Sequence, residues 1–173
     1  KRIGSRFLRA GPAYGGSCFP KDTRAILNTA NEIKSDLSLI KSVIKSNENR
    51  STILIQRIFK ILNGKLKNKK ICLLGVTFKA NTDDMRESSS LKIIPALSKK
   101  GALITYYDPT GQKKEFNKIK NVQFKPSIKT ACENSDLIII HTEWNDFKSV
   151  NFKKLMKKNK FKLFDMRNIY SFE

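Results

Sequence analysis

The chain of 173 residues is 39% hydrophobic and carries 35 Lys and Arg against 15 Asp and Glu, a formal charge of +20 at pH 7. This length allows one proper core with an extra helical segment, and the longest apolar runs, such as LIIIH, are far shorter than the roughly 20 residues of a membrane span. We therefore expect a globular protein without a membrane span or an export leader.

The three cysteines show neither metal-ligand spacing nor a disulfide framework, which predicts no metal site and a cytoplasmic location. Cys72 and Cys132 are expected to pack in the core. A charge of +20 favours nucleic acid, acidic lipid or phosphorylated small molecules as partners. Nucleic acid is disfavoured, because the lysines are scattered over helix ends and loops without the interleaved aromatic residues of a single-strand platform.

The chain up to residue 63 is predicted to be helical. A first helix over residues 19–33 places Ile26, Ala30 and Ile33 on one face, and Ser35 or Asp36 can begin a longer helix. That helix would be roughly 40 Å long at 1.5 Å per residue, too long for so small a domain to cover. We expect part of it to pack on something outside this chain, through an apolar stripe that comprises Leu37, Ile40, Ile44, Ile55, Ile58, Phe59 and Leu62.

From residue 64 onward, short β-rich runs alternate with helical segments. This alternation predicts right-handed crossovers and a parallel sheet, and hence an α/β fold. Pro95 lies inside one predicted helix, which must kink or begin later than the pattern suggests. Strands are expected at 70–76, 102–108, 136–142 and 162–166, and helices at 88–100, 127–134 and 152–158.

Cations follow the predicted strands at the edge where parallel sheets bind ligands. Lys79 and Arg86 come after the first strand and Arg167 after the last, so the three could converge on a diphosphate. The run LLGVTFKAN lacks G-x-G-x-x-G and does not predict an ordinary dinucleotide site. From position alone, an equally supported alternative is that Lys79 and Arg86 pair with the acidic residues of TDDMRE.

The run GPAYGGSCFPKD sets Cys18 between a glycine-rich turn and the expected start of a helix. The positive end of that helix, and Lys21 one turn away, both favour thiolate over thiol, as a nucleophile requires. Gly15 and Gly16 let the backbone come close to a substrate. Spacing alone supports a nucleophile and a buried loop thiol equally.

Four motifs resemble the UDP-glucose 6-dehydrogenase family in order and spacing, over nearly all of the chain. They are RIGSRFLRAGPAYGGSCFPKD, TFKANTDDMRESSSL, TEW and DMRN. The related GDP-mannose and UDP-N-acetylmannosamine dehydrogenases share the architecture, but CFPKD and TDDMRES are closer to the UDP-glucose branch. The resemblance implies a central helical, dimerising segment over residues 1–63 and a Rossmann-like, parallel-sheet UDP-binding domain over residues 64–173.

The resemblance also implies oxidation of UDP-glucose to UDP-glucuronate with two NAD+, in which Cys18 is the nucleophile. The aldehyde is trapped as a thiohemiacetal, oxidised to a thioester and hydrolysed. Asp22 matches an aspartate that helps the hydrolytic water, and its alternative role is helix capping. Lys21 and Arg86 match residues that contact NAD+.

The substrate contacts implied by the resemblance come from three parts of the chain. Residues 7–11 and Gly15 match a loop that closes over the sugar nucleotide with backbone amides as phosphate donors. Arg2 matches an arginine that reaches the neighbouring subunit's site. The expected substrate-binding residues are Arg2, Phe7, Leu8, Arg9, Ala10, Gly11, Tyr14, Gly15, Phe78, Lys79 and Arg167.

Three further residues near the predicted strand ends are interpreted more conservatively. A lone histidine can act as a base, but His141 is expected to be a satisfied residue at the end of a strand. Glu143 and Trp144 of the TEW motif could line the cleft or pack, and packing is favoured.

The sequence has no counterpart of the family's amino-terminal half, including the NAD+ fingerprint and four further catalytic residues. We therefore expect the chain alone to lack dehydrogenase activity, although NAD is the expected cofactor of the whole enzyme. In the family the long helix forms a dimer interface, so a homodimer is expected. The alternatives are a non-catalytic sugar-nucleotide binding module, a related UDP-N-acetylhexosamine or GDP-mannose dehydrogenase, and a basic nucleic-acid binder.

Overall fold

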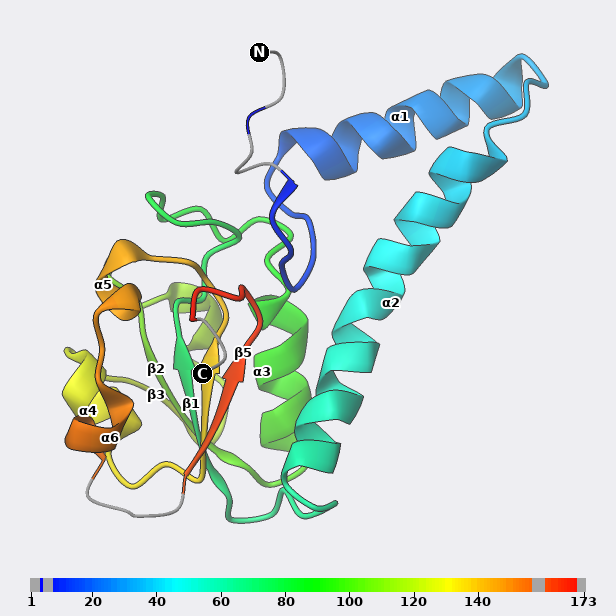
Figure 1. Cartoon of the computed structure of the whole chain (residues 1–173). Coiled ribbons are helices and arrows are strands. Elements are labelled where there is room, and N and C mark those ends of the chain that lie inside the picture. The colour runs from blue at the N-terminus through cyan, green and yellow to red at the C-terminus, as the bar shows by residue number, and fades with distance from the viewer. Residues whose placement is uncertain (1–3, 5–7, 157–160, 171–173) are drawn as a thin grey trace.

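Five parallel strands form the sheet at the centre of the fold (Figure 1). The computed structural model describes residues 4, 8–156 and 161–170. The strands lie in the spatial order β3-β2-β1-β4-β5, which confirms the expected parallel α/β fold. Their bounds are β1 Lys70–Leu74, β2 Leu103–Tyr107, β3 Val122–Phe124, β4 Leu137–Ile140 and β5 Lys162–Asp165.

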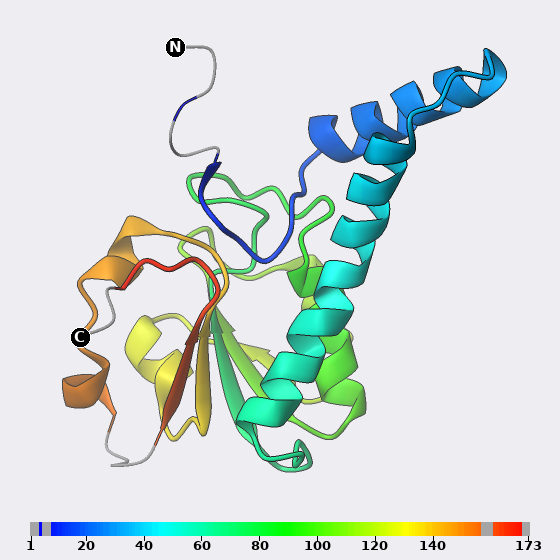
Figure 2. The same cartoon turned by 45° about the vertical axis from the view of Figure 1, so that its right-hand side comes forward.

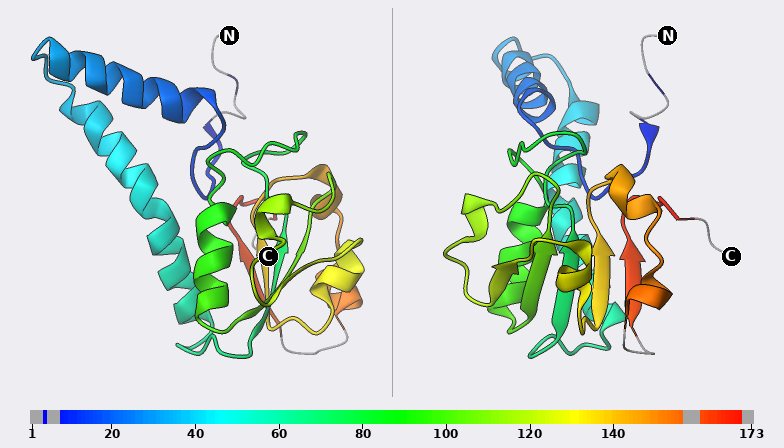
Figure 3. Two further views of the ribbon diagram at one scale, coloured as in Figure 1. Left: turned by 180° about the vertical axis from the view of Figure 1, so that it is seen from behind. Right: turned by 90° about the vertical axis from the view of Figure 1, so that its left-hand side faces the viewer.

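Helices cover both faces of this sheet, as Figure 3 shows. On one face lie α2 and α3, and on the other lie α4, α5 and α6. The long helices are α1 Cys18–Glu32, α2 Ser38–Ile61 and α3 Ser90–Lys99, and the short ones are η2 Lys114–Phe116, α4 Ile128–Cys132, α5 Asn145–Lys148 and α6 Phe152–Leu155. None of the described helices is both long and apolar enough to cross a membrane.

The central strand β1 is apolar on both of its faces because both are covered. Ile71 and Leu73 belong to the core on the α2 and α3 side, whereas Cys72 and Leu74 belong to the core on the other side. Continuous apolar runs are typical of parallel strands buried on both faces. The Sγ atoms of Cys72 and Cys132 lie 3.7 Å apart, and both residues are fully buried, which confirms that they pack in the core.

Helix α2 has one half in this core and one half outside it. Leu54, Ile58 and Leu62 pack against the sheet in its carboxyl-terminal half, whereas Leu39, near its start, is 74% exposed. In Figure 2 the upper part of α2 stands with α1 away from the sheet. The domain cannot cover the whole helix, as its length predicted.

Several details of the predicted elements are wrong. The stripe on α2 runs through Leu54 rather than through Phe59, which is exposed, because the buried side of the helix passes through Ser51, Leu54 and Ile58 at spacings of three and four residues. Helix α3 begins at Ser90, two residues later than the pattern suggested, and continues through Pro95. The elements β3, η2 and α5 were not predicted, because each is only three or four residues long and too short to show a periodic pattern.

Candidate functional site

An open cavity of about 1260 Å³ lies between the 9–18 loop, α2 and the carboxyl ends of β1, β4 and β5. Its volume is somewhat above the range of about 300–1,000 Å³ that is typical of small-molecule sites. The cationic side chains on its wall are Arg9, Arg50, Lys79, Lys148 and Arg167, and the acidic ones are Asp84 and Glu143. An excess of positive charge at the strand ends suits an anionic ligand.

Cys18 lines this cavity as the first residue of α1. It is exposed and unbridged, with its Sγ 3.6 Å from the Oγ of Ser17. The expectation of a helix beginning close to this thiol is confirmed. The alternative of a buried loop thiol is wrong, because the side chain faces the open cavity.

The glycines of the preceding loop allow it to touch the sheet domain. A Cβ at Gly15 would lie 2.6 Å from the backbone oxygen of Glu87. Gly16 has a φ of +84°, and a Cβ there would lie 2.9 Å from the Phe78 ring. Its N–H donates to the oxygen of Arg86 at 2.8 Å. Any side chain at these two positions would push the loop off the domain.

Arg167 is the most buried cation of the cavity wall, with a side chain that is 9% exposed. Its Nε donates to the oxygen of His141 and its Nη2 to the oxygen of Phe78, both at 3.0 Å. Its Nη1 lies 3.6 Å from a carboxylate oxygen of Glu143. Burial lowers the pKa of Arg167 from its ordinary value, and the Glu143 charge opposes that shift.

The three cations expected at the strand ends do not all converge. Lys79 lines the cavity with its Nζ 5.3 Å from the centre of the Phe78 ring. Arg86 is not among the lining residues, because its guanidinium pairs with Asp84 of its own loop at 2.7 Å. This pair raises the pKa of Arg86 and lowers the pKa of Asp84. For Arg86 the pairing alternative is therefore confirmed, whereas Lys79 and Arg167 share one cavity.

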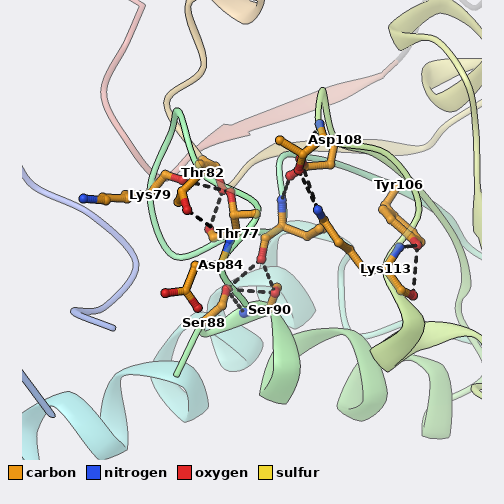
Figure 4. A network of polar contacts seen from close by, with 12 residues as sticks. Thr77, Lys79, Thr82, Asp84, Ser88, Ser90, Tyr106, Asp108 and Lys113 are labelled. Atoms are coloured by element: carbon orange, nitrogen blue, oxygen red, sulfur yellow. Dashed lines mark hydrogen bonds and ion pairs between the residues drawn. The ribbon is translucent and has the colours of Figure 1, made fainter. Parts of the chain in front are cut away.

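The segment that carries Lys79 is held by a network of buried hydrogen bonds (Figure 4). The hydroxyls of Ser88 and Ser90 both donate to the oxygen of Val76. The N–H of Val76 donates to Asp108 at 2.9 Å, which ties the exit of β1 to the exit of β2. The Lys79 side chain extends away from this network (Figure 4). A satisfied polar network of this kind fixes the backbone beneath an exposed cation.

The other predicted site residues lie in different places. Arg9, Gly11, Tyr14, Gly15 and Phe78 line the cavity. Arg2 and Phe7 fall outside the described residues. The exposed residues Leu8, Ala10, Lys21 and Asp22 are not among those that line it.

Asp22 does not cap α1 but pairs with Lys21 at 3.1 Å, and both side chains are largely exposed. This pair raises the pKa of Lys21. The capping alternative for Asp22 is therefore wrong. Asp22 lies four residues after Cys18 on α1, hence on the same side of the helix.

The cavity also contains residues that sequence reasoning missed. Asn47 and Arg50 come from α2, and Asn145 and Lys148 come from α5. The expectation that Glu143 packs is wrong, because it lines the cavity beside Arg167, whereas Trp144 packs as expected. Among the described residues, no three His, Cys, Asp or Glu side chains form a group that could hold a metal ion.

His141 is a satisfied buried residue, as expected. Its Nε2 lies 2.8 Å from the hydroxyl of Ser89 and its Nδ1 lies 3.0 Å from the hydroxyl of Thr142. Burial, aided by the nearby Arg167 charge, lowers the pKa of His141 to about 3. The imidazole is therefore neutral at physiological pH and joins the start of α3 to the end of β4.

We expect this burial to make the stability of the protein fall in mild acid. Unfolding returns the pKa of His141 to its ordinary value of 6.5, so the unfolded state binds the extra proton between pH 6.5 and about 3. Stability is thus retained above pH 6.5 and lost below it, by about 1.4 kcal/mol per pH unit. Urea unfolding of the wild type and of His141→Gln at several pH values measures this loss of stability. The stability difference between them should shrink by about 2 kcal/mol between about pH 7.5 and about pH 5, and a constant difference would contradict this assignment.

A Rossmann-like sheet with a cationic cavity at its strand ends defines the class of nucleotide-binding α/β domains. Residues 72–172 match the UDP-binding domain of the UDP-glucose/GDP-mannose dehydrogenase family, and residues 1–49 match the central domain of that family. The chain therefore belongs to the UDP-glucose/GDP-mannose dehydrogenase family, as the motifs predicted.

Individual relatives agree with this assignment. The chain is 40% identical to a UDP-glucose 6-dehydrogenase of Rhizobium meliloti over 170 residues, which are 98% of this chain and 39% of that protein. It is 41% identical to the UDP-glucose 6-dehydrogenase YwqF of Bacillus subtilis over 177 residues, which cover 100% of this chain and 40% of that protein. The chain thus spans about two fifths of the length of these curated relatives.

Solved structures of the family show the same fold. A UDP-glucose dehydrogenase from Pyrobaculum islandicum superposes with a TM-score of 0.82 at 28% identity, over 97% of this chain and 38% of that one. The GDP-mannose dehydrogenase from Pseudomonas aeruginosa superposes with a TM-score of 0.76 at 26% identity, over 99% of this chain and 40% of that one.

Proposed function

We propose that the whole protein oxidises UDP-glucose to UDP-glucuronate, and that this chain supplies the nucleotide-binding part and the nucleophile. One observation carries the proposal: Cys18, Lys79 and Arg167 line the same cavity, although they come from three distant parts of the sequence. A thiol and two cations around one open space can hold a diphosphate and attack a carbon attached to it. UDP-glucose 6-dehydrogenases among the relatives support this choice of substrate.

In this proposal Lys79 and Arg167 bind the diphosphate from the same edge of the sheet, where Lys79 follows β1 and Arg167 follows β5. Lys79 supplies an exposed charge, whereas Arg167 is fixed by two carbonyl groups. The 9–17 loop adds backbone N–H groups, and Phe78 adds an aromatic face beside Lys79. Donors that are fixed before the ligand arrives strengthen the attraction for a phosphate.

Cys18 acts on the sugar. Its thiolate adds to the C6 aldehyde and forms a thiohemiacetal, and after oxidation to the thioester a water replaces the sulfur, which leaves as thiolate. Asp22, on the same side of α1, accepts a proton from that water. Covalent capture keeps the aldehyde in the site.

The described residues do not fit NAD+ as a dinucleotide. That site needs a glycine-rich turn leading from a strand directly into a helix, whereas here residues 75–89 separate β1 from α3. Two hydrides leave the sugar C6, and accepting them is the chemistry that NAD+ supplies in this family. Lys21 and Arg86 are proposed to reach the cofactor from this chain.

We also propose that the whole protein dimerises through α1 and α2. Apolar side chains are exposed on both helices and at the end of α1; they are Ile26, Ile33, Leu39 and Ile53. Exposed apolar patches of this kind mark sites of protein association.

A calorimetric titration with UDP-glucose tests the nucleotide site. The folded chain should give a saturable heat, and Lys79→Ala should weaken binding roughly tenfold, because one exposed charge-assisted contact to phosphate is lost. Lys129→Ala, which removes an exposed lysine of α4 far from the cavity, is the matched control. If the folded chain gives no saturable heat at millimolar UDP-glucose, the residues present here do not form the nucleotide half of the site.

A further inference from the structure

Two side chains of α2 bind the backbone of the loop that precedes Cys18. Asn47 accepts a hydrogen bond from the N–H of Tyr14 at 2.9 Å and donates its amide to the oxygen of the same residue at 3.2 Å. One turn further along α2, the Nε of Arg50 donates to the oxygen of Pro12 at 3.2 Å, and its Nη2 lies 3.5 Å from the oxygen of Gly11. Four contacts thus join one helix to a loop more than thirty residues away.

The same loop also packs against the sheet domain, so closely that its glycines leave no room for a Cβ atom. A Cβ at Gly11 would lie 2.6 Å from the Nη1 of Arg167, and one at Gly15 would lie 2.6 Å from the oxygen of Glu87. The loop is therefore enclosed between α2 and the strand-end segments that carry Phe78 and Arg167. Its position depends on both neighbours.

The side-chain amide of Asn47 is suited to binding the backbone of Tyr14. It offers one donor and one acceptor, and it matches both polar groups of a single residue's backbone. It also stands in the buried stripe of α2 between Ile44 and Leu54, where an apolar residue would be expected if packing alone mattered. A polar side chain at such a position needs hydrogen-bond partners, and the backbone of Tyr14 supplies them.

The bonds to α2 divide the polar groups of the loop into two sets. The oxygens of Gly11, Pro12 and Tyr14 are occupied by α2. Among the described residues, the N–H groups of Gly11, Ala13 and Gly15 make no hydrogen bond, and these residues line the cavity. Free N–H groups beside the cationic side chains of the cavity can donate hydrogen bonds to an anionic ligand.

The contact between Asn47 and Tyr14 also affects the position of the nucleophile. The ring of Tyr14 meets the ring of Phe19 edge-on, with centroids 4.7 Å apart. Phe19 directly follows Cys18 in the first turn of α1. Asn47, by fixing Tyr14, thus also fixes the start of the helix that carries the thiol.

From these contacts we infer that Asn47 and Arg50 are positioning residues, which hold the 9–17 loop in the shape that presents its N–H groups to a diphosphate and Cys18 to the sugar. The inference rests on the proposed function for the identity of the ligand. Its structural part, the clamp on Tyr14, stands independently of any ligand.

The test compares four variants in the folded chain. Asn47→Ala removes both hydrogen bonds to Tyr14, and Asn47→Asp keeps the acceptor but removes the donor. Arg50→Lys keeps the charge but lacks the two guanidinium nitrogens that contact the oxygens of Pro12 and Gly11. Asn49→Ala changes an exposed asparagine of the same helix and is the control. The readouts are amide hydrogen exchange of Tyr14 and Gly16 by NMR, UDP affinity by calorimetry, and the Tm.

Exchange of the Tyr14 amide should be roughly fivefold faster in Asn47→Ala, because one hydrogen bond of about 1 kcal/mol protects it. It should stay protected in Asn47→Asp, since a carboxylate oxygen still accepts. UDP affinity should fall roughly tenfold in Asn47→Ala and in Arg50→Lys but not in Asn49→Ala. A merely structural role would lower the Tm and leave the UDP affinity of the folded protein unchanged, and that result would overturn the inference.

The two proposals fail in different ways. If the wild type does not bind UDP, the proposed function fails, but the exchange of the Tyr14 amide still decides whether Asn47 holds the loop. If the wild type binds UDP and Asn47→Ala leaves both the exchange rate and the affinity unchanged, the positioning role is wrong. Should Asn47→Ala fail to fold, Arg50→Lys gives the same decision through UDP affinity.

Discussion

Replacing Arg167 with methionine is expected to weaken UDP binding by roughly 100-fold or more. The Arg167 side chain is only 9% exposed, so water screens its attraction for a phosphate less than it would screen that of an exposed cation. Two carbonyl groups, those of His141 and Phe78, hold it in place before any ligand arrives. Calorimetry with UDP measures the loss, and charge-assisted bonds of about 1.5–3 kcal/mol each set its size.

Two further variants separate the effect of the Arg167 charge from the effect of its contacts with the two carbonyl groups. Arg167→Lys keeps the charge but cannot reach both carbonyl groups at once, so it should recover only part of the affinity. Glu143→Gln leaves both carbonyl contacts of Arg167 intact and removes one negative charge from the cavity, so it should bind UDP at least as tightly as the wild type. If Arg167→Met remains folded and binds UDP normally, Arg167 belongs to the structure of the wall and not to the ligand site.

How much the sequence could predict depended on the range of each signal. The apolar runs of β1 and β4 predicted buried parallel strands, since a strand covered on both faces has to be continuously apolar. The sequence also indicated that Lys79 and Arg167 would meet, because parallel strands end at one edge. It could not show that Arg86 would turn to Asp84, which is a choice between two rotamers of an exposed side chain.

The missed residues of α2 illustrate the same limit. Asn47 and Ser51 stand in stripe positions between Ile44 and Leu54, and this break in the apolar pattern was visible in the sequence. The apolar periodicity alone does not indicate what these two polar residues do. Only the folded structure shows that the loop before Cys18 lies against Asn47, because that contact spans 33 residues.

Gly75→Ala is expected to lower the free energy of unfolding by about 3 kcal/mol or more. Gly75 follows β1 with a φ of +75°, a conformation that costs an L-residue roughly 1 kcal/mol. A Cβ there would lie 2.5 Å from the Cβ of Thr142, which follows β4. Thr142 cannot move away easily, because it is fully buried and its hydroxyl donates to the oxygen of Thr77 at 2.8 Å. Overpacking at such a place costs about 1–3 kcal/mol in addition.

Gly111→Ala is the matched control, because Gly111 has a φ of +87° but nothing within 4 Å of its Cβ position. Its cost in urea unfolding should be the backbone strain alone, and the excess cost of Gly75→Ala then measures the clash with Thr142. Equal costs would mean that β1 and β4 do not approach closely at this point. An excess cost would show that glycine at this position is what lets the ends of the two central strands come together beneath Lys79 and Arg167.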